Sequence, residues 1–383
     1  MPRIHSIPIP LVAEGLLAAF FILLGGCALP KYPGESARFL REIAAGQRGD
    51  STVRPPAGPA AKALAFTVQG RRQTGDLYLP AASPARAGMV LVAGLAELGN
   101  RDPRLVQFAQ SLTRSRFAVL VPEIPNLRRL EIGPEDGRRV ADAFRYLVAR
   151  PDLAPRGRAG IAAASYAVGP AVLAALEPDL RDRVRFIVGI AGHYDPEEVM
   201  IFAVTGFYRD QTERHPRWRR KDPDRYSKWA FLARNFDFSP RARDRVLLRE
   251  IATRKLKHPD TPVADLARQL GPHGRDYFRL LTAKRPEQVR EMIARLPPAA
   301  RRQISAVNLA DHDLTPLKAT MILVHGRNDQ LIPYTESKAL AAAAPKAKLY
   351  LVENFTHVDF GELSLSDSLQ FMRAVSAVLD FRN

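Results

Sequence analysis

The chain has 383 residues, a formal net charge of +17 and a hydrophobic content of 46%. This length and composition are typical of a globular protein with one large core or two smaller ones. The positive charge fits either an anionic partner or an arginine-rich proteome. No basic run is interleaved with aromatic side chains, and the single cysteine excludes zinc-finger spacing, so nothing indicates a nucleic-acid partner.

The first 27 residues have the features of a secretory signal. Arg3 and His5 precede a short apolar segment at 15–24, which is shorter than the roughly 20 apolar residues of a spanning helix. Residues 24–27 read Leu-Gly-Gly-Cys and resemble the lipobox of bacterial lipoproteins. That resemblance implies a lipidated Cys27 at the mature N-terminus, on the cell envelope. Ala28 after it favours the outer membrane, periplasmic side, of a Gram-negative cell. A buried structural cysteine is the alternative.

Residues 28–62 are rich in Pro, Gly, Ala and charged residues, which predicts a tether with one short amphipathic helical piece at 36–45. From about residue 63 the chain is expected to be ordered. Two strands, at 64–69 and 74–79, form a predicted hairpin.

Short apolar strands then alternate with amphipathic helices. The predicted strands are 89–93, 117–121, 159–163 and 184–190, and the predicted helices are 103–113, 134–149 and 170–176. Short strands without polar residues are typical of a sheet covered on both faces. The alternation therefore predicts an α/β fold with a mostly parallel, doubly wound sheet.

The alternation stops at Asp195. Residues 196–309 contain charged, aromatic, helix-like segments separated by prolines and show no clear strand, which predicts an inserted helical cap. The alternation returns with strands at 320–324 and 348–352 and helices at 336–343 and 364–379. The α/β core is therefore expected at 63–195 and 310–383.

One serine lies in a turn of small residues between a predicted strand and a predicted helix. Residues 163–167 read Ala-Ala-Ser-Tyr-Ala, so alanine replaces both glycines of the G-x-S-x-G nucleophile elbow. Small side chains are needed there because the strand and helix backbones pass close together. Ser165 is therefore a candidate nucleophile. An ordinary alanine-rich junction with Ser165 as helix N-cap is the alternative.

An acid and a histidine follow the last two predicted strands. Asp329 lies in the string HGRNDQLIP after one strand, and His357 lies after the next. The carboxyl ends of parallel strands form the usual site of open α/β sheets. The order Ser165, Asp329, His357 is that of the triad in α/β-hydrolases. Asp195 is a rival acid, and His193 beside it is compatible with an ordinary loop histidine.

With these motifs the chain resembles the α/β-hydrolase family of serine esterases and peptidases, over residues 63–200 and 310–383. The resemblance implies that Ser165 is the nucleophile, His357 the general base and Asp329 its orienting partner. It also implies an oxyanion hole made by the backbone amides of Leu95 and Tyr166.

These residues suit acyl transfer. A serine hydroxyl attacks well only when a base takes its proton, and a carboxylate fixes the tautomer of that base. The leading expectation is a serine hydrolase that cleaves a carboxylic ester through an acyl-enzyme intermediate, with the cap shaping an apolar acyl pocket. A peptidase or amidase of the same fold and an inactive lipid-tethered scaffold that binds a partner are the alternatives. No His/Cys cluster or phosphate-binding glycine loop indicates a metal or cofactor.

Overall fold

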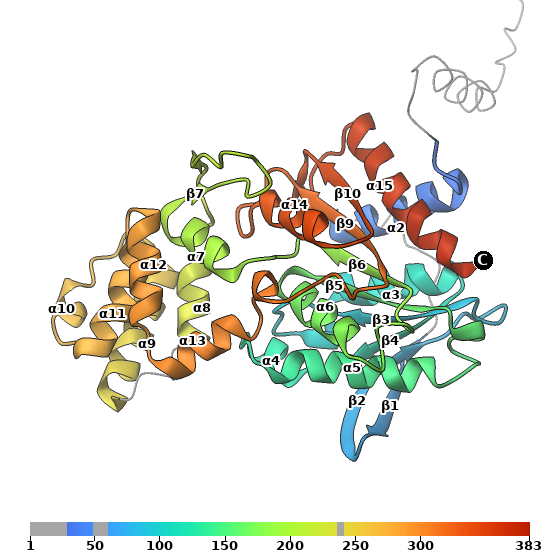
Figure 1. Ribbon diagram of the computed structural model, residues 1–383, viewed down its shortest axis with the longest axis horizontal. Coiled ribbons are helices and arrows are strands. Elements are labelled where there is room, and N and C mark those ends of the chain that lie inside the picture. The colour runs from blue at the N-terminus through green and yellow to red at the C-terminus, as the bar shows by residue number, and fades with distance from the viewer. Residues whose placement is uncertain (1–28, 49–59, 236–240) are drawn as a thin grey trace, which may run out of the picture.

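The computed structural model of the chain describes residues 29–48, 60–235 and 241–383. The signal predicted for residues 1–27, with Cys27, lies outside the described residues. None of the helices in the described ranges is long and apolar enough to cross a bilayer. The described chain forms an α/β body with a group of helices at one end (Figure 1).

Within the described residues, eight strands form one sheet in the order β1-β2-β4-β3-β5-β6-β9-β10. β1 and β2 form the predicted antiparallel hairpin, and β2 also pairs antiparallel with β4. Every other neighbouring pair is parallel, which confirms the predicted sheet type. The strands are β1 (Lys62–Val68), β2 (Arg71–Tyr78), β3 (Ala87–Val92), β4 (Phe117–Pro122), β5 (Ala159–Ala164), β6 (Phe186–Ile190), β9 (Thr320–Gly326) and β10 (Ala347–Val352).

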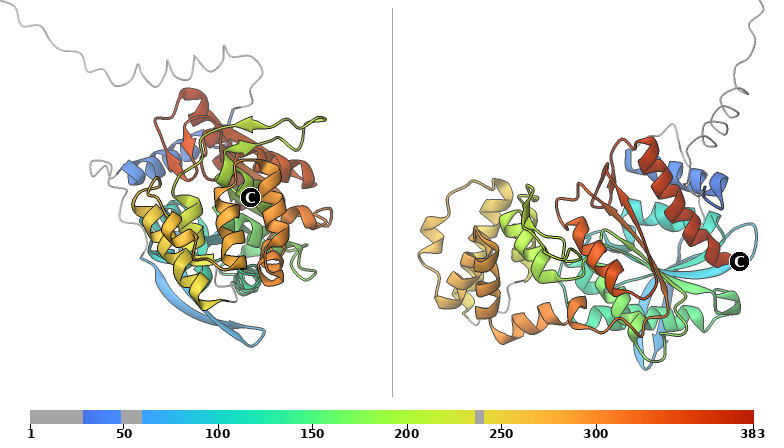
Figure 2. Two further views of the ribbon diagram at one scale, coloured as in Figure 1. Left: turned by 90° about the vertical axis from the view of Figure 1, so that its left-hand side faces the viewer. Right: turned by 45° about the horizontal axis from the view of Figure 1, so that its top comes forward.

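Helices cover both faces of this sheet (Figures 1 and 2). Successive strand residues point to opposite faces, so two apolar layers form. One layer packs under α5, α6 and α14, and the other packs under α2, α3 and α15. These helices are α2 (Pro33–Arg48), α3 (Pro103–Arg114), α5 (Glu135–Val148), α6 (Val168–Leu176), α14 (Tyr334–Ala343) and α15 (Leu365–Leu379). A short helix, α4 (Pro125–Arg128), follows β4.

The N-terminal helix α2 differs from the sequence prediction. The segment 28–62 is predicted to be a tether with a short helical piece, but residues 33–48 form a 16-residue helix. Phe39, Leu40 and Ile43 are buried in the layer that α3 and α15 also form. Glu35 pairs with Arg382 at 2.7 Å and fixes the helix to the C-terminal end of the chain. The tether interpretation is therefore wrong for these residues, because the amphipathic pattern has a folded surface to pack against.

The cap predicted at 196–309 contains seven described helices with a core of their own. Trp229, Leu248, Ile251 and Val289 are among its buried residues. The sequence prediction of no strand is wrong for one short hairpin, β7 (Phe207–Tyr208) with β8 (Arg219–Arg220). The cap helices are α7 (Pro196–Thr205), α8 (Ser227–Asn235), α9 (Ala242–Lys257), α10 (Ala264–Ala267), α11 (Pro272–Thr282), α12 (Pro286–Arg295) and α13 (Pro298–Ser305).

Candidate active site

Ser165 occupies a strained turn between β5 and α6. Its φ is +54°, a left-handed conformation that non-glycine residues rarely adopt and that costs on the order of 1–3 kcal/mol. Ala163 and Ala167 on either side are only 1% and 0% exposed, so both small side chains are packed in the interior. The turn thus has the backbone form of a nucleophile elbow although both flanking glycines are alanine.

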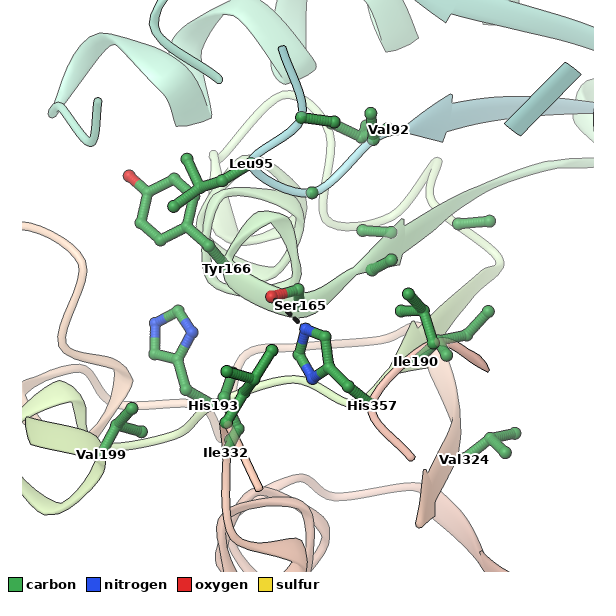
Figure 3. A pocket seen from close by; sticks show the side chains of 18 of the residues that line it. Val92, Leu95, Ser165, Tyr166, Ile190, His193, Val199, Val324, Ile332 and His357 are labelled. Carbon is green, nitrogen blue, oxygen red and sulfur yellow. Dashed lines mark hydrogen bonds between the residues drawn. The ribbon is translucent and has the colours of Figure 1, made fainter. Parts of the chain in front are cut away.

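The loop after β3 passes close to this elbow. A Cβ added to Gly94 would lie 3.1 Å from Ser165 Cβ and 3.3 Å from the carbonyl oxygen of Ala164. Glycine at this position therefore lets the loop approach the serine. The next residue, Leu95, lies on the same side of Ser165 as Tyr166 (Figure 3).

The structure brings together the three side chains that the sequence singles out. Ser165 Oγ lies 2.9 Å from His357 Nε2 (Figure 3). His357 Nδ1 lies 2.9 Å from Asp329 Oδ2. The three residues follow β5, β10 and β9, at the carboxyl ends of parallel strands. Because the carboxylate accepts the proton of Nδ1, Nε2 is left as the acceptor that faces the serine hydroxyl.

Asp329 is buried and fully engaged. Its Oδ1 accepts hydrogen bonds from the backbone amides of Leu331 (2.7 Å) and Ile332 (3.0 Å). Its Oδ2 faces His357 Nδ1 and lies 3.2 Å from His325 Nε2. Burial opposes ionisation of Asp329, yet the hydrogen bonds from the two histidines outweigh it and hold its pKa well below the ordinary range. The carboxylate therefore stays charged.

His325, the first residue of the string HGRNDQLIP, is a positioning residue that the sequence analysis does not single out. Its side chain is fully buried, and Nε2 lies 3.0 Å from the Ile332 carbonyl oxygen as well as near the Asp329 carboxylate. Since Nε2 faces two acceptors it carries the proton, and Nδ1 then accepts from Ser337 Oγ at 2.7 Å. The only sequence signal was a histidine at the end of a buried strand.

The cap also contacts the acid loop. Lys221 Nζ donates to the backbone carbonyl oxygens of Asp329 (2.9 Å) and Arg327 (3.1 Å). A cap residue thus helps to fix the conformation of the loop that carries the acid.

The rival acid Asp195 has a different position. Its Oδ1 accepts from the backbone amide of Glu197 at 2.9 Å, so it caps the N-terminus of α7. No hydrogen bond joins it to a histidine within the described ranges. Burial raises the pKa of Asp195.

A second buried carboxyl lies next to Asp195. Glu336 Oε2 accepts from the backbone amides of Asp195 (2.7 Å) and Tyr194 (2.9 Å). Burial raises the pKa of Glu336 to about 8, although these two hydrogen bonds oppose the shift. Glu336 therefore holds a proton near neutral pH at the junction of body and cap.

The side chain of Tyr166 anchors the elbow. Its hydroxyl donates to Asp136 Oδ2 at 3.0 Å, and burial raises the pKa of this tyrosine. Its ring stacks on His193 with 5.9 Å between centroids and 9° between planes. Sequence reasoning named only the backbone amide of Tyr166.

His193 is a buried neutral histidine beside the site. Its Nε2 donates to the carbonyl oxygen of Val307 at 3.1 Å, and desolvation lowers its pKa. A Cβ on Gly169 would lie 2.9 Å from the His193 ring, so glycine there lets the ring approach α6. His193 lines the same cavity as Ser165 but makes no hydrogen bond to the triad among the described residues.

The two backbone amides that the sequence analysis assigns to an oxyanion hole belong to residues that line the cavity beside Ser165. Tyr166 directly follows the serine, and Leu95 belongs to the neighbouring loop. Within the described ranges no group accepts a hydrogen bond from the Leu95 amide. It is therefore available to a ligand.

A cavity of about 690 Å³ opens at Ser165 and His357. This volume lies in the range of small-molecule sites, about 300–1,000 Å³. Most of the lining is apolar. On the cap side it includes Phe231, Leu280, Leu296 and Ile304. No group of three or more potential metal ligands occurs in the part of the chain that the structure describes.

The sheet order, the antiparallel second strand and the strained serine between β5 and α6 define the α/β-hydrolase fold, here with a helical cap between β6 and β9. No protein-family model matches the chain, and no curated protein matches it.

Similar solved structures include the esterase domain of a Rhodothermus marinus protein, at 16% identity and TM-score 0.42, over 83% of this chain and 97% of that one. The carboxylesterase EstE1 from a metagenomic library has 11% identity and TM-score 0.45, over 91% and 98%. A puromycin-hydrolysing peptidase of Mycobacterium tuberculosis has 14% identity and TM-score 0.47, over 86% and 40%.

Proposed function

We propose that the protein is a serine hydrolase that cleaves carboxylic esters through an acyl-enzyme intermediate. The observation that carries this proposal is the unbroken chain of hydrogen bonds from Ser165 Oγ through His357 to Asp329 Oδ2, each of 2.9 Å. The left-handed backbone of Ser165 and the free Leu95 amide support it.

In the proposed mechanism Ser165 Oγ attacks the ester carbonyl carbon while His357 Nε2 takes the hydroxyl proton. Asp329 keeps the proton of the histidine on Nδ1 and stabilises the imidazolium that forms. The backbone amides of Leu95 and Tyr166 donate to the negative oxygen of the tetrahedral intermediate. In other enzymes, removing one such donor costs about 3–4 kcal/mol of transition-state stabilisation, and we expect a similar contribution from each amide here.

Collapse of the tetrahedral intermediate expels the alcohol, which receives the proton from His357 Nε2. Water then attacks the acyl-enzyme with the same histidine as base, and the acid is released with Ser165 regenerated. Every proton lost by a nucleophile thus returns to a leaving group.

The cavity favours an ester over a peptide. A peptide exposes an N–H and a carbonyl group at every residue, and each loses free energy when buried without a partner. The lining offers few such partners. A substrate with an apolar acyl group suits it better, which places the peptidase or amidase alternative second.

The lipobox-like sequence at residues 24–27 supports a location on the bacterial cell envelope. Lipidation of Cys27 would hold the enzyme on a membrane surface of the bacterial envelope, with α2 beginning six residues later at Pro33. Incorporation of a palmitate analogue in cells is expected for the wild type and not for Cys27→Ser. Equal labelling of the two would contradict the anchor.

A fluorophosphonate probe tests the nucleophile. It should label the wild type and not Ser165→Ala. Ser227→Ala is the matched control, because Ser227 lines the same cavity from the cap and should leave labelling unchanged. Labelling of Ser165→Ala at the wild-type rate would refute the assignment. No labelling of any form, together with no ester hydrolysis, would favour the inactive scaffold.

A further inference from the structure

The cavity at Ser165 continues into the layer between the sheet and helices α2, α3 and α15. Its lining includes Ala164, Ile190 and Val324, which are cross-strand neighbours in the first row of the sheet below the serine. It also includes Ala162 and Val188 in the second row, and Met89 in the third. We call this part of the cavity the inner arm.

The opposite wall of the inner arm comes from the three helices. Phe39 and Ile43 of α2, Phe108 of α3, and Phe371, Ala374 and Val378 of α15 line it. These side chains and the strand side chains are apolar. The charged residues that also line the cavity on this side are Arg104 at the start of α3 and its ion-pair partners Asp102 and Asp359. A polar group entering the inner arm would lose its hydrogen bonds to water without replacement, whereas a hydrocarbon chain would not.

The space arises from the small residues of β5. In the second row Ala162 stands between the larger side chains of Leu91 and Val188. Ala164, in the first row, immediately precedes Ser165 in the chain. The hollow therefore lies along the strand that presents the serine, and it begins at the reacting atom.

We infer that the inner arm binds the linear acyl chain of the substrate, so that the enzyme prefers esters of long unbranched acids. This inference rests on the proposed function, since it assumes that Ser165 is acylated. Substrates of this class are esters whose acyl chain is aliphatic and whose alcohol faces the cap.

The length of the chain follows from the sheet. From the row of Ala164 to the row of Met89 is four residues along the strands, or about 13 Å at roughly 3.3 Å per residue. An extended hydrocarbon advances about 1.25 Å per bond, from a bond length near 1.5 Å at the tetrahedral angle. The inner arm therefore accepts about ten carbons beyond the carbonyl.

A chain-length series tests the inference. For p-nitrophenyl acetate, butyrate, hexanoate and decanoate, kcat/KM should rise with chain length, by up to about fourfold per buried methylene. Ala374→Leu places a larger side chain in the inner arm. It should lower kcat/KM for the decanoate at least about tenfold and change the acetate by less than about twofold.

Ala377→Leu is the matched control. Ala377 lies on the same helix and packs in the same layer, but it does not line the cavity. Both esters should be unaffected. Ala162→Leu fills the inner arm from the sheet side and replaces Ala374→Leu if that variant does not fold.

Binding without catalysis separates this inference from the proposed function. Ser165→Ala should bind decanoic acid, whose chain has the length of the inner arm, in isothermal titration calorimetry, and the double variant with Ala374→Leu should lose that binding. Hydrolysis of the acetate with no rise toward the decanoate ester, or no binding of decanoic acid, would overturn the inner arm but leave the hydrolase. Binding of decanoic acid that is sensitive to Ala374→Leu, with no ester hydrolysis, would keep the inner arm and overturn the hydrolase.

Discussion

Replacing Asp329 by asparagine should leave the fold in place and reverse the tautomer of His357. Oδ1 accepts from the amides of Leu331 and Ile332, and only the oxygen of an asparagine can do so. Its NH₂ group must then take the place of Oδ2 and face His357 Nδ1. A donor at that point makes Nδ1 an acceptor and places the histidine proton on Nε2. A protonated Nε2 cannot accept the proton of the serine hydroxyl.

The expected loss follows from that reversal. Where the same exchange has been made in another serine hydrolase triad, kcat falls about 10⁴-fold, which corresponds to about 5.5 kcal/mol of transition-state stabilisation. A loss of that size is expected for Asp329→Asn. KM should change little, because the cavity lining is not altered.

The assay is hydrolysis of a p-nitrophenyl ester, with the melting temperature as a check on folding. Asp195→Asn is the matched control, because asparagine caps a helix as well as aspartate and, in the described part of the chain, no hydrogen bond joins Asp195 to the triad. It should retain activity within about threefold. Loss of less than about tenfold in Asp329→Asn, or abolition of turnover in Asp195→Asn instead, would refute the reasoning.

Three further substitutions have defined outcomes. The folded pKa of Glu336, about 8, exceeds its ordinary value of 4.5, so stability should fall as pH rises from about 4.5 to 8, by up to about 1.4 kcal/mol per pH unit. Thermal unfolding of Glu336→Gln should lack that slope, and an unchanged slope would contradict the assignment. Tyr166→Phe removes a buried donor to Asp136 and should lower the free energy of unfolding in urea by about 1–3 kcal/mol. Its kcat should stay within about threefold, because the backbone amide remains, and a large loss of kcat at unchanged stability would argue against a purely anchoring side chain. Lys221→Met removes one of the cap's contacts with the Asp329 loop, while the hydrogen bond from the Asp224 amide to the Gln330 carbonyl oxygen remains, and should lower kcat about fivefold, or about 1 kcal/mol, without changing the melting temperature. An unchanged kcat would show that the loop keeps its conformation without Lys221.

The alternation of strands and helices could be predicted because it depends on local patterns. A short apolar strand reflects burial of both its faces, and a helical periodicity reflects burial of one face. The strand and helix boundaries in the structure agree with the predicted ones within a few residues. Ser165, Asp329 and His357 could be singled out for a related reason. Each follows a predicted strand, and the carboxyl ends of parallel strands meet at one edge of the sheet.

The prediction was weakest where the structure depends on a distant partner. Residues 33–48 have an amphipathic pattern too brief to distinguish a tether from a packed helix. They form a packed helix because α3 and α15 provide an apolar surface for it. The contact of His325 with Asp329, and the capping role that sets Asp195 apart, likewise depend on how loops close in space.

The sequence by itself determined the type of sheet, the place of the cap and three residues in the order of a triad. Only the tertiary structure decided that these side chains lie 2.9 Å apart, which acid faces the histidine, and that the cavity extends beneath α2. Local order follows from neighbours in the chain, but a cavity is bounded by residues far apart in it. The alanines of β5 show this difference. In the sequence they indicate only that a tight turn is possible, whereas in the structure they also leave room for a ligand.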